Sequence, residues 1–393
     1  MNASSPLPPP VPQGRGDDAL ALYIHWPFCI SKCPYCDFNS HVRDTVDQIL
    51  WRDALLSDLA HEAALTPGRK LQSIFFGGGT PSLMPPATVA ALLDAAERHW
   101  GFAPGIEITL EANPSSVEAA RFADIAAAGV NRVSLGLQAL DDVALRFLGR
   151  AHDVREGLGA LDIAQSVFDR VTFDLIYARP DQSAEDWHHE LTRALALGTG
   201  HLSLYQLTIE DGTRFATDAQ KGHLVELDPD RAADLFEATR ATTDAAGLPA
   251  YEVSNHARKG QESRHNLAYW RYQDYLGIGP GAHGRRLGQA TVRHKKPENW
   301  LKRVAATGHG LQVEHALSPR ERATEALLMG LRLDEGVDLA NLTRKTGITD
   351  LIDPKAEQRL TALGFTTRTA DTLRVTPAGM LLLNAILADL VVT

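Results

Sequence analysis

From residue 19 onward, short apolar runs alternate with longer stretches of helical character, and this alternation predicts the fold. Each apolar run is rich in β-branched or aromatic residues and is short enough for a buried strand. Between the runs lie Ala/Leu-rich segments such as ATVAALLDAAERHW, which are typical of helices. Repeated strand–helix–strand units of this kind indicate a parallel sheet. The six predicted strands are residues 20–26, 71–78, 106–112, 131–138, 170–178 and 201–209.

The residues at the strand ends favour a barrel over an open sheet. Successive strands end at a loop that contains all the cysteines, at GGGT (residues 77–80), and then at Glu111, Gln138 and Asp174. In a parallel barrel the C-terminal ends of the strands meet at one mouth, where the chemistry collects. Polar or glycine residues at consecutive strand ends therefore predict one shared site. The predicted fold is α/β, with a partial (β/α)6 TIM-like barrel.

Composition divides the chain into four parts. Residues 1–18, MNASSPLPPPVPQGRGDD, are proline-rich and lack the apolar region of a signal peptide, so we expect a flexible tail. The barrel is predicted over residues 19–285, followed by a connecting segment over 286–317. Residues 318–393 read as helix, turn, helix, and then as a short strand pair with a closing helix. This pattern predicts a smaller, mostly helical and winged-helix-like C-terminal domain.

The charge and hydropathy of the chain argue against two classes of function. Its 393 residues carry a formal net charge of −10, and no basic stripe marks the C-terminal part. Tracking a nucleic-acid backbone needs an excess of Lys and Arg, so no nucleic-acid partner is expected. No window approaches about eighteen uninterrupted apolar residues, so no membrane span is expected and only peripheral membrane association is left open. An odd number of cysteines without a secretory signal indicates the reducing cytoplasm.

All three cysteines, Cys29, Cys33 and Cys36, lie in one loop with the spacing C-x3-C-x2-C. Structural zinc normally takes four protein ligands, a set that His25 or His41 could complete, so a zinc-stabilised interaction module is one interpretation. A redox C-x-x-C pair is another, although it leaves Cys29 without a purpose. The third is a four-iron cluster held by three thiolates, which leaves one iron open to a small molecule that chelates through an amine and a carboxylate.

Two neighbouring motifs resemble a known superfamily. The cysteine loop, with Tyr35 before its last cysteine, is followed one strand later by FFGGGTPS. Together they resemble the cluster loop and the glycine-rich stretch of radical S-adenosylmethionine (radical SAM) enzymes. Further motifs, YIHWPFC, CDFNS, EANP, SLGLQ, LGRAH, DLIYARP and YEVSNHA, resemble the coproporphyrinogen dehydrogenase-like branch over roughly residues 20–390. One well-known member of that branch decarboxylates coproporphyrinogen III oxidatively, and another is a haem chaperone that passes haem to acceptor proteins.

The resemblance implies two cofactors and the residues that hold them. Cys29, Cys33 and Cys36 would bind a [4Fe-4S] cluster, with Tyr35 beside it. The positions that match S-adenosylmethionine contacts in the family are Tyr23, Gly78, Gly79, Thr80, Glu111, Gln138, Arg150 and Asp174, with Ala282 and His283 on the adenine side.

The chemistry of three of these residues suits that cofactor. Glu111 and Asp174 would accept hydrogen bonds from its amine and its ribose hydroxyls, and Arg150 would pair with its carboxylate. For Arg150 the alternative is a surface salt bridge, which would contribute only about 0–1 kcal/mol.

Two departures from the dehydrogenase pattern favour the chaperone. The dehydrogenase carries a fourth cysteine where this chain has Phe38, and it has a longer segment before its cluster strand. In addition, HNLAYW (residues 265–270) matches a motif of the haem chaperones. His265 would offer a neutral imidazole to haem iron, Tyr269 would lie one turn along, and Trp270 would supply an apolar wall. The alternative is a buried aromatic cluster, extended by Tyr272 and Tyr275, in which the histidine is merely hydrogen-bonded.

The sequence therefore predicts a haem chaperone that carries a [4Fe-4S] cluster and S-adenosylmethionine. Haem-accepting proteins, membrane-bound respiratory proteins among them, are the expected partners. The alternative function is that of an oxygen-independent coproporphyrinogen III dehydrogenase. The sequence leaves open whether the protein is an enzyme.

Overall fold

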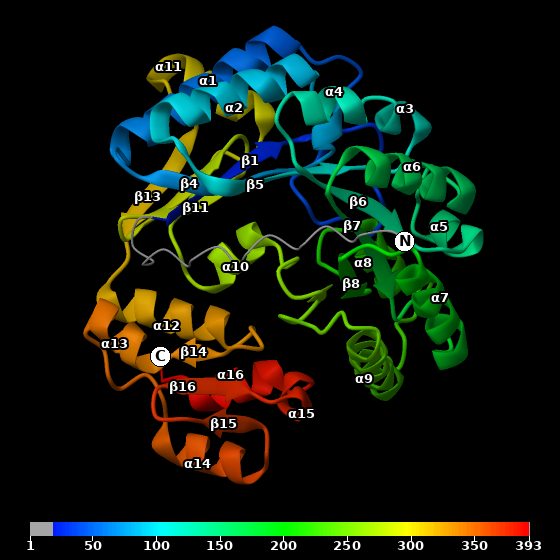
Figure 1. The fold of residues 1–393 in the computed structure, drawn as a ribbon, viewed down its shortest axis with the longest axis vertical. Coiled ribbons are helices and arrows are strands. Elements are labelled where there is room, and N and C mark those ends of the chain that lie inside the picture. The colour runs from blue at the N-terminus through cyan, green and yellow to red at the C-terminus, as the bar shows by residue number, and fades with distance from the viewer. Residues whose placement is uncertain (1–18, 393) are drawn as a thin grey trace, which may run out of the picture.

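The computed structural model describes residues 19–392, so the predicted tail over residues 1–18 lies outside the described part. One large sheet of eleven strands and a smaller C-terminal unit make up the structure (Figure 1). The large sheet has the strand order β13-β12-β11-β10-β1-β4-β5-β6-β7-β8-β9.

All six predicted strands are present, and they lie side by side in chain order as a parallel array. They are β1 (Ala19–Trp26), β4 (Lys70–Gly78), β5 (Phe102–Ala112), β6 (Arg132–Gln138), β7 (Arg170–Tyr177) and β8 (His201–Gln206). The sheet ends in β9 (Asn255–Ala257), which pairs antiparallel with β8. The two edge strands, β9 and β13, do not pair with each other, so the barrel is laterally open.

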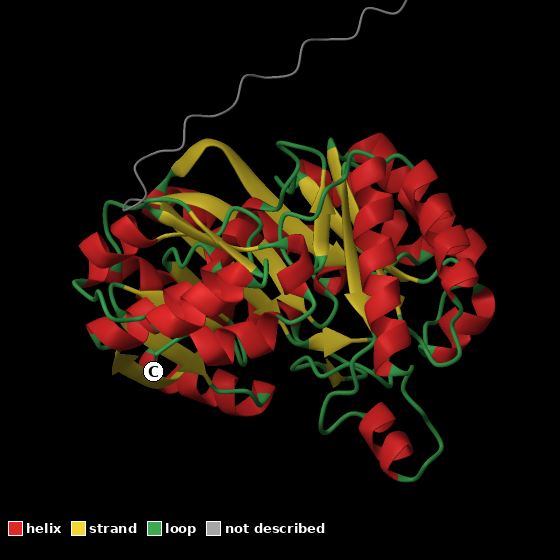
Figure 2. Ribbon diagram, turned by 90° about the horizontal axis from the view of Figure 1, so that it is seen from below, coloured by secondary structure: helices red, strands yellow, loops and turns green. Residues whose placement is uncertain are grey.

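Helices cover the outer side of the strands (Figures 1 and 2). Figure 1 shows them in an arc around the sheet, with α10 inside the arc. Those of the barrel are α1 (Gln48–Leu65), α2 (Pro86–Trp100), α3 (Ser116–Ala119), α4 (Phe122–Ala127), α5 (Asp142–Phe147), α6 (Val154–Val167), α7 (Ala184–Ala196), α8 (Arg214–Gln220), α9 (Pro229–Ala245) and α10 (Arg264–Trp270), with a 3-10 turn η1 (Pro81–Leu83).

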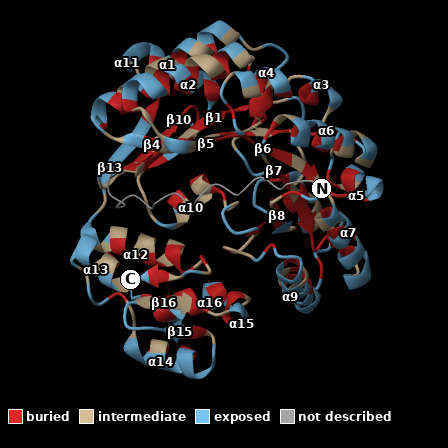
Figure 3. Cartoon of the chain, viewed as in Figure 1, coloured by how far each residue is buried: buried red, intermediate tan, exposed pale blue. Residues whose placement is uncertain are grey.

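Local sequence signals set where these helices begin. The carboxylate of Asp47 accepts hydrogen bonds from the backbone N–H groups of Ile49 and Leu50 in the first turn of α1, and Ser183 forms a reciprocal capping box with Asp186 at the start of α7. Such caps satisfy backbone donors that have no partner within the helix. The strands need no such signal, because both of their faces are buried and apolar residues follow one another (Figure 3).

The segment 286–317 is part of the large sheet, which corrects its prediction as a connection. From β1 the sheet continues through β10 (Tyr275–Ile278) in parallel, and then through three antiparallel strands. These strands are β11 (His283–Arg286), β12 (Gln289–Arg293) and β13 (Leu311–Ala316), and α11 (Pro297–Thr307) lies between the last two.

A buried ionic cluster holds this extension against α1. The guanidinium of Arg293 lies 2.7 Å from the Asp58 carboxylate and 2.8 Å from the Glu62 carboxylate, and Arg286 lies 2.5 Å from Glu62. These four side chains are at most 4% exposed. Unpaired charges at such depth would be strongly destabilising. The sequence did not predict this extension, because arginines such as Arg286 and Arg293 are typical of exposed positions.

The C-terminal unit has the predicted mostly helical, winged-helix-like composition. Its elements are α12 (Pro319–Gly330), β14 (Val337–Asp338), α13 (Leu339–Thr346), α14 (Pro354–Ala362), β15 (Thr366–Arg368), β16 (Thr372–Val375), α15 (Pro377–Met380) and α16 (Leu383–Leu390). The three strands form a separate sheet in the order β14-β16-β15 around a core of its own. That core includes Phe236 of α9, which joins the unit to the barrel. Within residues 19–392 no helix is long and apolar enough to cross a membrane.

Candidate cofactor and ligand cavities

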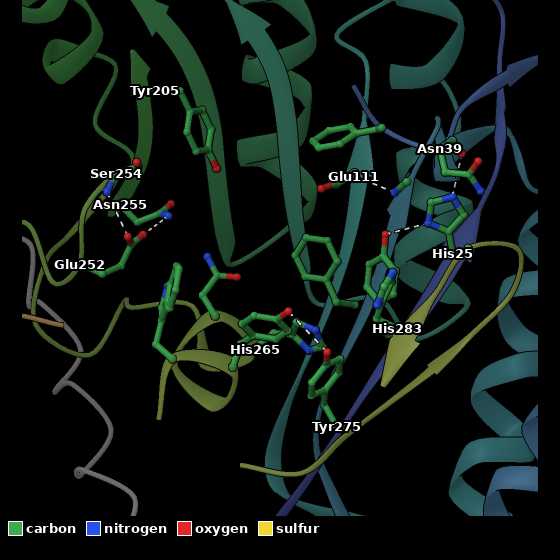
Figure 4. A pocket seen from close by; sticks show the side chains of 18 residues that line it. His25, Asn39, Glu111, Tyr205, Glu252, Ser254, Asn255, His265, Tyr275 and His283 are labelled. Carbon is green, nitrogen blue, oxygen red and sulfur yellow. Dashed lines mark hydrogen bonds between the residues drawn. The ribbon is translucent and has the colours of Figure 1, made fainter. Parts of the chain in front are cut away.

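Two adjoining cavities lie where the barrel strands end. The first, of about 330 Å³, contains all three cysteines, and we call it the cysteine cavity. The second, of about 520 Å³, contains His265, and we call it the histidine cavity (Figure 4). Phe38, Gly78 and Glu111 line both cavities, so the two are neighbours rather than separate sites.

The cysteine loop leaves β1 and includes a short parallel pair, β2 (Phe28–Cys29) and β3 (His41–Val42). The three thiols are free and partly buried. Thr80 donates a hydrogen bond to Cys29 Sγ over 3.4 Å, and Cys36 Sγ lies 3.8 Å from the hydroxyl of Ser40. Burial raises the pKa of the Cys29 and Cys36 thiols and so favours their protonated forms. A bound metal cation would instead favour the thiolates. Among residues 19–392, no group of three or more His, Cys, Asp or Glu side chains is placed to hold one metal ion.

The glycines at the end of β4 permit a close approach of this strand to β1 and to the start of the cysteine loop. A Cβ on Gly78 would lie 2.5 Å from the ring of His25, and a Cβ on Gly79 would lie 2.6 Å from the backbone oxygen of Phe28. Gly78 also has a φ of 112°, which disfavours any other residue. The backbone N–H of Gly79 donates to the backbone oxygen of Trp26 over 2.7 Å, and that of Thr80 donates to the backbone oxygen of Phe28 over 2.8 Å. The GGGT motif is therefore a packing requirement of this edge of the barrel.

Arg150 connects the cysteine loop to the strand ends. Its Nη1 donates to Cys33 Sγ over 3.3 Å, and its Nη2 donates to Asn113 over 2.7 Å and to the backbone oxygen of Gly136 over 3.0 Å. Its Nε is buried and has no hydrogen-bond partner in the described chain. The Arg150 guanidinium therefore does not form the surface salt bridge that was the alternative interpretation of this residue. It keeps one donor available to an acceptor in the cavity, such as a carboxylate.

Two carboxyl groups lie in the cysteine cavity: Glu111, near the end of β5, and Asp174, within β7. Burial, followed by the charge of Asp174, raises the pKa of Glu111 to about 8, and Glu111 accepts a hydrogen bond from the N–H of Gly78 over 3.3 Å. Burial raises the pKa of Asp174 to about 6, against the opposing hydrogen bonds of Ser203 and Ser134. A cationic amine beside these groups would favour their charged forms.

The residue at the end of β6, Gln138, has a φ of 70°. A glutamine in this left-handed region carries backbone strain, which is typically retained where a side chain must face a site. Gln138 lines the cysteine cavity.

His265 lies within a wall of aromatic rings in the histidine cavity (Figure 4). Its Nδ1 lies 3.1 Å from the hydroxyl of Ser73, and its ring centroid lies 5.1 Å from that of Phe75 and 6.4 Å from that of Tyr23. Burial lowers the pKa of His265 to about 4, so its imidazole is neutral at pH 7. Its other nitrogen, Nε2, makes no hydrogen bond to the described residues.

Glu107 of β5 sets the position of α10. Its buried carboxylate accepts hydrogen bonds from the backbone N–H groups of Arg264 and His265, each over 3.2 Å, and from the hydroxyl of Ser263 over 3.4 Å. Arg170 pairs with the same carboxylate at 2.6 Å. Despite the cost of its burial, nearby Arg132 and Arg170 hold the pKa of Glu107 below its ordinary value. The first turn of α10, and His265 with it, is thus tied to the barrel wall.

A chain of hydrogen bonds joins the histidine cavity to the cysteine loop. His25 Nε2 lies 2.9 Å from the backbone oxygen of Asn39, and His25 Nδ1 lies 3.0 Å from the hydroxyl of Tyr23. Burial lowers the pKa of His25 to about 4, so the ring carries one proton. Because the carbonyl can only accept, Nε2 donates to it, and the Tyr23 hydroxyl must donate to Nδ1. The Asn39 amide also donates to the backbone oxygens of Pro280 and Lys295, each over 2.9 Å.

Comparison with known proteins places this geometry in a family. A Radical SAM superfamily model matches residues 23–194, and a HemN C-terminal domain model matches residues 317–382. "Heme chaperone HemW" of Escherichia coli (strain K12) is 38% identical over 378 residues, which cover 94% of this chain and 97% of that protein. The chain belongs to the radical SAM superfamily. Within it, the chain falls in the HemN-like branch close to HemW.

A second relative and one solved structure support the same placement. The bovine protein "Radical S-adenosyl methionine domain-containing protein 1, mitochondrial" is 43% identical over 331 residues, covering 82% of this chain and 75% of the relative. The structure of coproporphyrinogen III oxidase (HemN) from Escherichia coli superposes with a TM-score of 0.81 over 95% of this chain and 90% of that chain. At 23% identity, that likeness shows the fold alone.

The radical SAM superfamily implies a [4Fe-4S] cluster and S-adenosylmethionine, and the residues of the cysteine cavity fit both. Three free thiols from one loop line a single cavity, which suits a cluster with three thiolate ligands. The free Nε of Arg150 and the buried carboxyl groups of Glu111 and Asp174 suit a ligand that carries a carboxylate, an amine and hydroxyls.

The structure sorts the sequence-predicted residues between the two cavities. Besides the cysteines, Tyr35, Gly79, Thr80, Gln138, Arg150 and Asp174 line the cysteine cavity, and Gly78 and Glu111 line both. Tyr23, His265, Tyr269, Trp270 and His283 line the histidine cavity.

Three expected S-adenosylmethionine contacts are placed differently from the others. Tyr23 and His283 lie with His265, and not among the residues of the cysteine cavity. Ala282 is buried and lines neither cavity, and its backbone N–H donates to the oxygen of Gly279.

Sequence reasoning missed several residues that line the cavities. Among them are the polar residues Asn113, Ser134, Tyr205, Glu252 and Asn255. Asn113 lies in the EANP motif, and Glu252 and Asn255 lie in YEVSNHA, so the motifs contained a signal for these residues. Ser134 likewise lies in the SLGLQ motif, whereas Tyr205 follows ordinary strand alternation and carries no such signal.

Proposed function

We propose that this protein is a haem chaperone that binds haem in the histidine cavity and passes it to haem-accepting proteins, membrane-bound respiratory proteins among them. The observation that carries the proposal is the state of His265. Its imidazole is neutral at pH 7, Nδ1 is held by Ser73, and Nε2 makes no hydrogen bond within residues 19–392. A neutral imidazole with one nitrogen fixed and the other free is the form that ligates haem iron.

The walls of the histidine cavity support a flat, apolar ligand. Seven aromatic side chains line it, namely Tyr23, Phe38, Phe75, Tyr205, Tyr269, Trp270 and Tyr275. Its volume of about 520 Å³ falls in the range of about 300–1,000 Å³ that is usual for ligand sites. The alternative of a plain aromatic cluster would require these rings to fill the space between them, and they enclose a cavity instead.

The cysteine cavity would hold the cofactors of the family. Cys29, Cys33 and Cys36 would bind the [4Fe-4S] cluster, and Arg150 would orient the carboxylate of S-adenosylmethionine. When bound, the cluster offers one iron without a protein ligand to the amine and carboxylate of that cofactor. Glu111 lines both cavities, so it would contact the cofactor on one side and face the haem cavity on the other.

The second candidate function is oxygen-independent coproporphyrinogen III dehydrogenation, which the likeness to the HemN structure favours. That likeness extends to the fold alone. The presence of Phe38 at the position of the fourth cysteine weighs against it. Phe38 is 59% exposed and lines both cavities, which suits a hydrophobic contact at their common edge better than metal chemistry.

An anaerobic haem titration tests the proposal. The wild-type protein, with its cluster reconstituted, should show a Soret shift on titration with haem, and His265→Ala should weaken haem binding at least about tenfold. His188→Ala is the matched control, because His188 lies exposed on α7 and lines neither cavity. An unchanged titration of His265→Ala would remove this residue from the site.

An activity assay separates the two functions. Incubation with coproporphyrinogen III, S-adenosylmethionine and a reductant should yield no protoporphyrinogen IX. Efficient conversion would overturn the chaperone proposal, and failure of the wild-type protein to bind haem at all would do the same.

A further inference from the structure

We propose that the histidine cavity selects porphyrins by the placement of their carboxylates: haem enters with its vinyl edge first and keeps both propionates at the mouth, whereas a porphyrin with a propionate on every pyrrole ring is rejected. This inference deepens the proposed function and rests on it. It follows from the charges that the cavity contains and from those that it does not.

The cavity wall offers no positive charge to a propionate. Of the residues that line it, none is Lys or Arg within the described chain. The basic groups of the wall are His25, His265 and His283, and burial is the main cause that lowers the pKa of each below its ordinary value. The wall also contains two carboxyl groups, those of Glu111 and Glu252. A carboxylate that enters therefore meets neutral or acidic neighbours.

The inner wall near β9 is rich in acceptors. The carboxyl group of Glu252 accepts hydrogen bonds from the N–H of Ser254 over 3.0 Å and from the amide Nδ2 of Asn255. The remaining amide oxygen, Asn255 Oδ1, is buried and has no donor among residues 19–392. Burial raises the pKa of Glu252, so the site already disfavours one negative charge. A propionate here would lie beside an acidic group and beside an amide oxygen that already lacks a donor.

The second carboxyl group lies on another side of the cavity. In Figure 4, Glu111 and Glu252 lie far apart, with His265 and Tyr275 below them. Burial and the neighbouring Asp174 raise the pKa of Glu111 to about 8. A porphyrin with carboxylates around its whole periphery could not turn away from both groups. A porphyrin with one apolar edge can place that edge between them.

Positive charge is found instead next to residues at the edge of the cavity. Exposed Lys295 lies near His283, and after burial it is the second cause that lowers the pKa of this histidine. On another side, the guanidinium carbon of Arg332 lies 5.9 Å from the ring centroid of Trp270. His283 and Trp270 line the cavity, whereas the two cations do not. This arrangement favours propionates at the mouth, where water and these cations solvate them.

The chemistry of the two porphyrins makes this a selection rule. Haem carries propionates on two adjacent pyrrole rings and vinyl groups on the other two, so half of its periphery is free of charge. Coproporphyrin III carries a propionate on each of its four rings, so any edge that enters brings carboxylates with it. Burying an unpaired carboxylate is costly, and the cavity would therefore discriminate strongly against the second porphyrin.

Three ligands test the rule on the full chain with its cluster reconstituted. Haem and haem dimethyl ester should bind with affinities within about threefold of each other, because the propionates stay outside, and iron coproporphyrin III should bind at least about tenfold more weakly. Equal or tighter binding of iron coproporphyrin III, while haem still binds, would overturn the inference and leave the proposed function intact. Absence of haem binding would overturn both.

A variant locates the selection in the wall. Glu252→Gln keeps the shape of the side chain and replaces its acidic group by an amide that can donate a hydrogen bond to a carboxylate, so the preference for haem over iron coproporphyrin III should narrow by a factor of about three or more. Glu226→Gln is the matched control, because Glu226 is exposed and lines neither cavity. A preference unchanged in Glu252→Gln would overturn the role of this carboxyl group, and the comparison of the three ligands on the wild-type protein stands even if the variant does not fold.

Discussion

The cysteine cavity and the histidine cavity adjoin, yet they differ in the kind of buried polar group that each leaves without a partner. In the cysteine cavity, Arg150 keeps a buried donor without a partner, and three free thiols face the same space. In the histidine cavity, His265 is bonded to Ser73, and His25 is bonded at both ring nitrogens. The first is therefore a site completed by polar and metallic ligands. The second is a wall of aromatic rings around a fixed imidazole, and the buried lining atom without a partner there is an acceptor, Asn255 Oδ1.

The largest expected effect is on the cysteine cavity. Cys33→Ser should abolish the iron–sulfur absorption and the electron paramagnetic resonance signal of the reconstituted, dithionite-treated protein, because a hydroxyl cannot replace a thiolate as a cluster ligand. Ile30→Ser, an exposed change in the same loop, should leave the cluster intact. If the two cavities are independently built, Cys33→Ser will still bind haem. Full iron and sulfide content in Cys33→Ser would contradict the cluster assignment.

The next effect tests how rigidly the histidine cavity is held. Glu107→Gln removes the charge that pairs with Arg170 and caps α10, so it should lower the free energy of unfolding by about 3–5 kcal/mol. Urea denaturation would measure this loss. Glu97→Gln, an exposed change on α2, is the control and should alter stability by less than about 0.5 kcal/mol. A stable Glu107→Gln variant with unchanged haem spectra would show that α10 does not depend on this carboxylate.

Arg150 offers a sharper test of the cysteine cavity. Arg150→Lys keeps the charge but loses the planar fork, so S-adenosylmethionine affinity should fall by about 1.5–3 kcal/mol at equal cluster content. Isothermal titration calorimetry on the reconstituted protein measures the change. Arg146→Lys, at an exposed position of α5, serves as the control. The same dissociation constant in wild type and Arg150→Lys would exclude this guanidinium as the carboxylate partner.

A smaller effect is expected at Ser73. Ser73→Ala removes the hydrogen bond to His265 Nδ1, and haem affinity should fall by about 0.5–1.5 kcal/mol, with a changed ferric haem spectrum. The exposed Ser166→Ala variant should show neither change. Affinity and spectrum both equal to wild type would mean that Ser73 does not orient the ligand.

The two cavities should also differ in the sign of their pH dependence. The pKa of Glu111 is raised by burial from 4.5 to about 8, so its stabilising contribution is complete below pH 4.5 and is lost as pH rises toward 8. The pKa of His265 is lowered from 6.5 to about 4, so its contribution is complete above pH 6.5 and is lost as pH falls toward 4. Urea unfolding at pH 5, 6.5 and 8 without added S-adenosylmethionine measures both slopes.

Single variants assign these slopes. Glu111→Gln should flatten the loss of stability on the alkaline side, and His265→Phe should flatten the loss on the acid side. Parallel curves for wild type and Glu111→Gln would show that this carboxyl group does not titrate as its burial implies.

Much of the barrel could be predicted because local pattern and tertiary role agree there. The six buried strands are short apolar runs, and parallel strands in chain order need no long-range information to be found. The cysteine loop could be found for the same reason, since all its thiols come from one local segment. The segment 286–317 could not, because its place in the sheet depends on ion pairs with α1, more than 220 residues away in sequence.

The sequence by itself determined which residues carry the chemistry: three thiols at cluster spacing, glycines that permit close packing, and a histidine among aromatic residues. Only the tertiary structure decided how these residues are divided between two cavities. Tyr23 and His283 lie with His265, and Glu107 holds α10 in place across the barrel wall. The physical reason is that side-chain direction and pKa depend on burial and on hydrogen bonds between distant strands, which no local pattern contains.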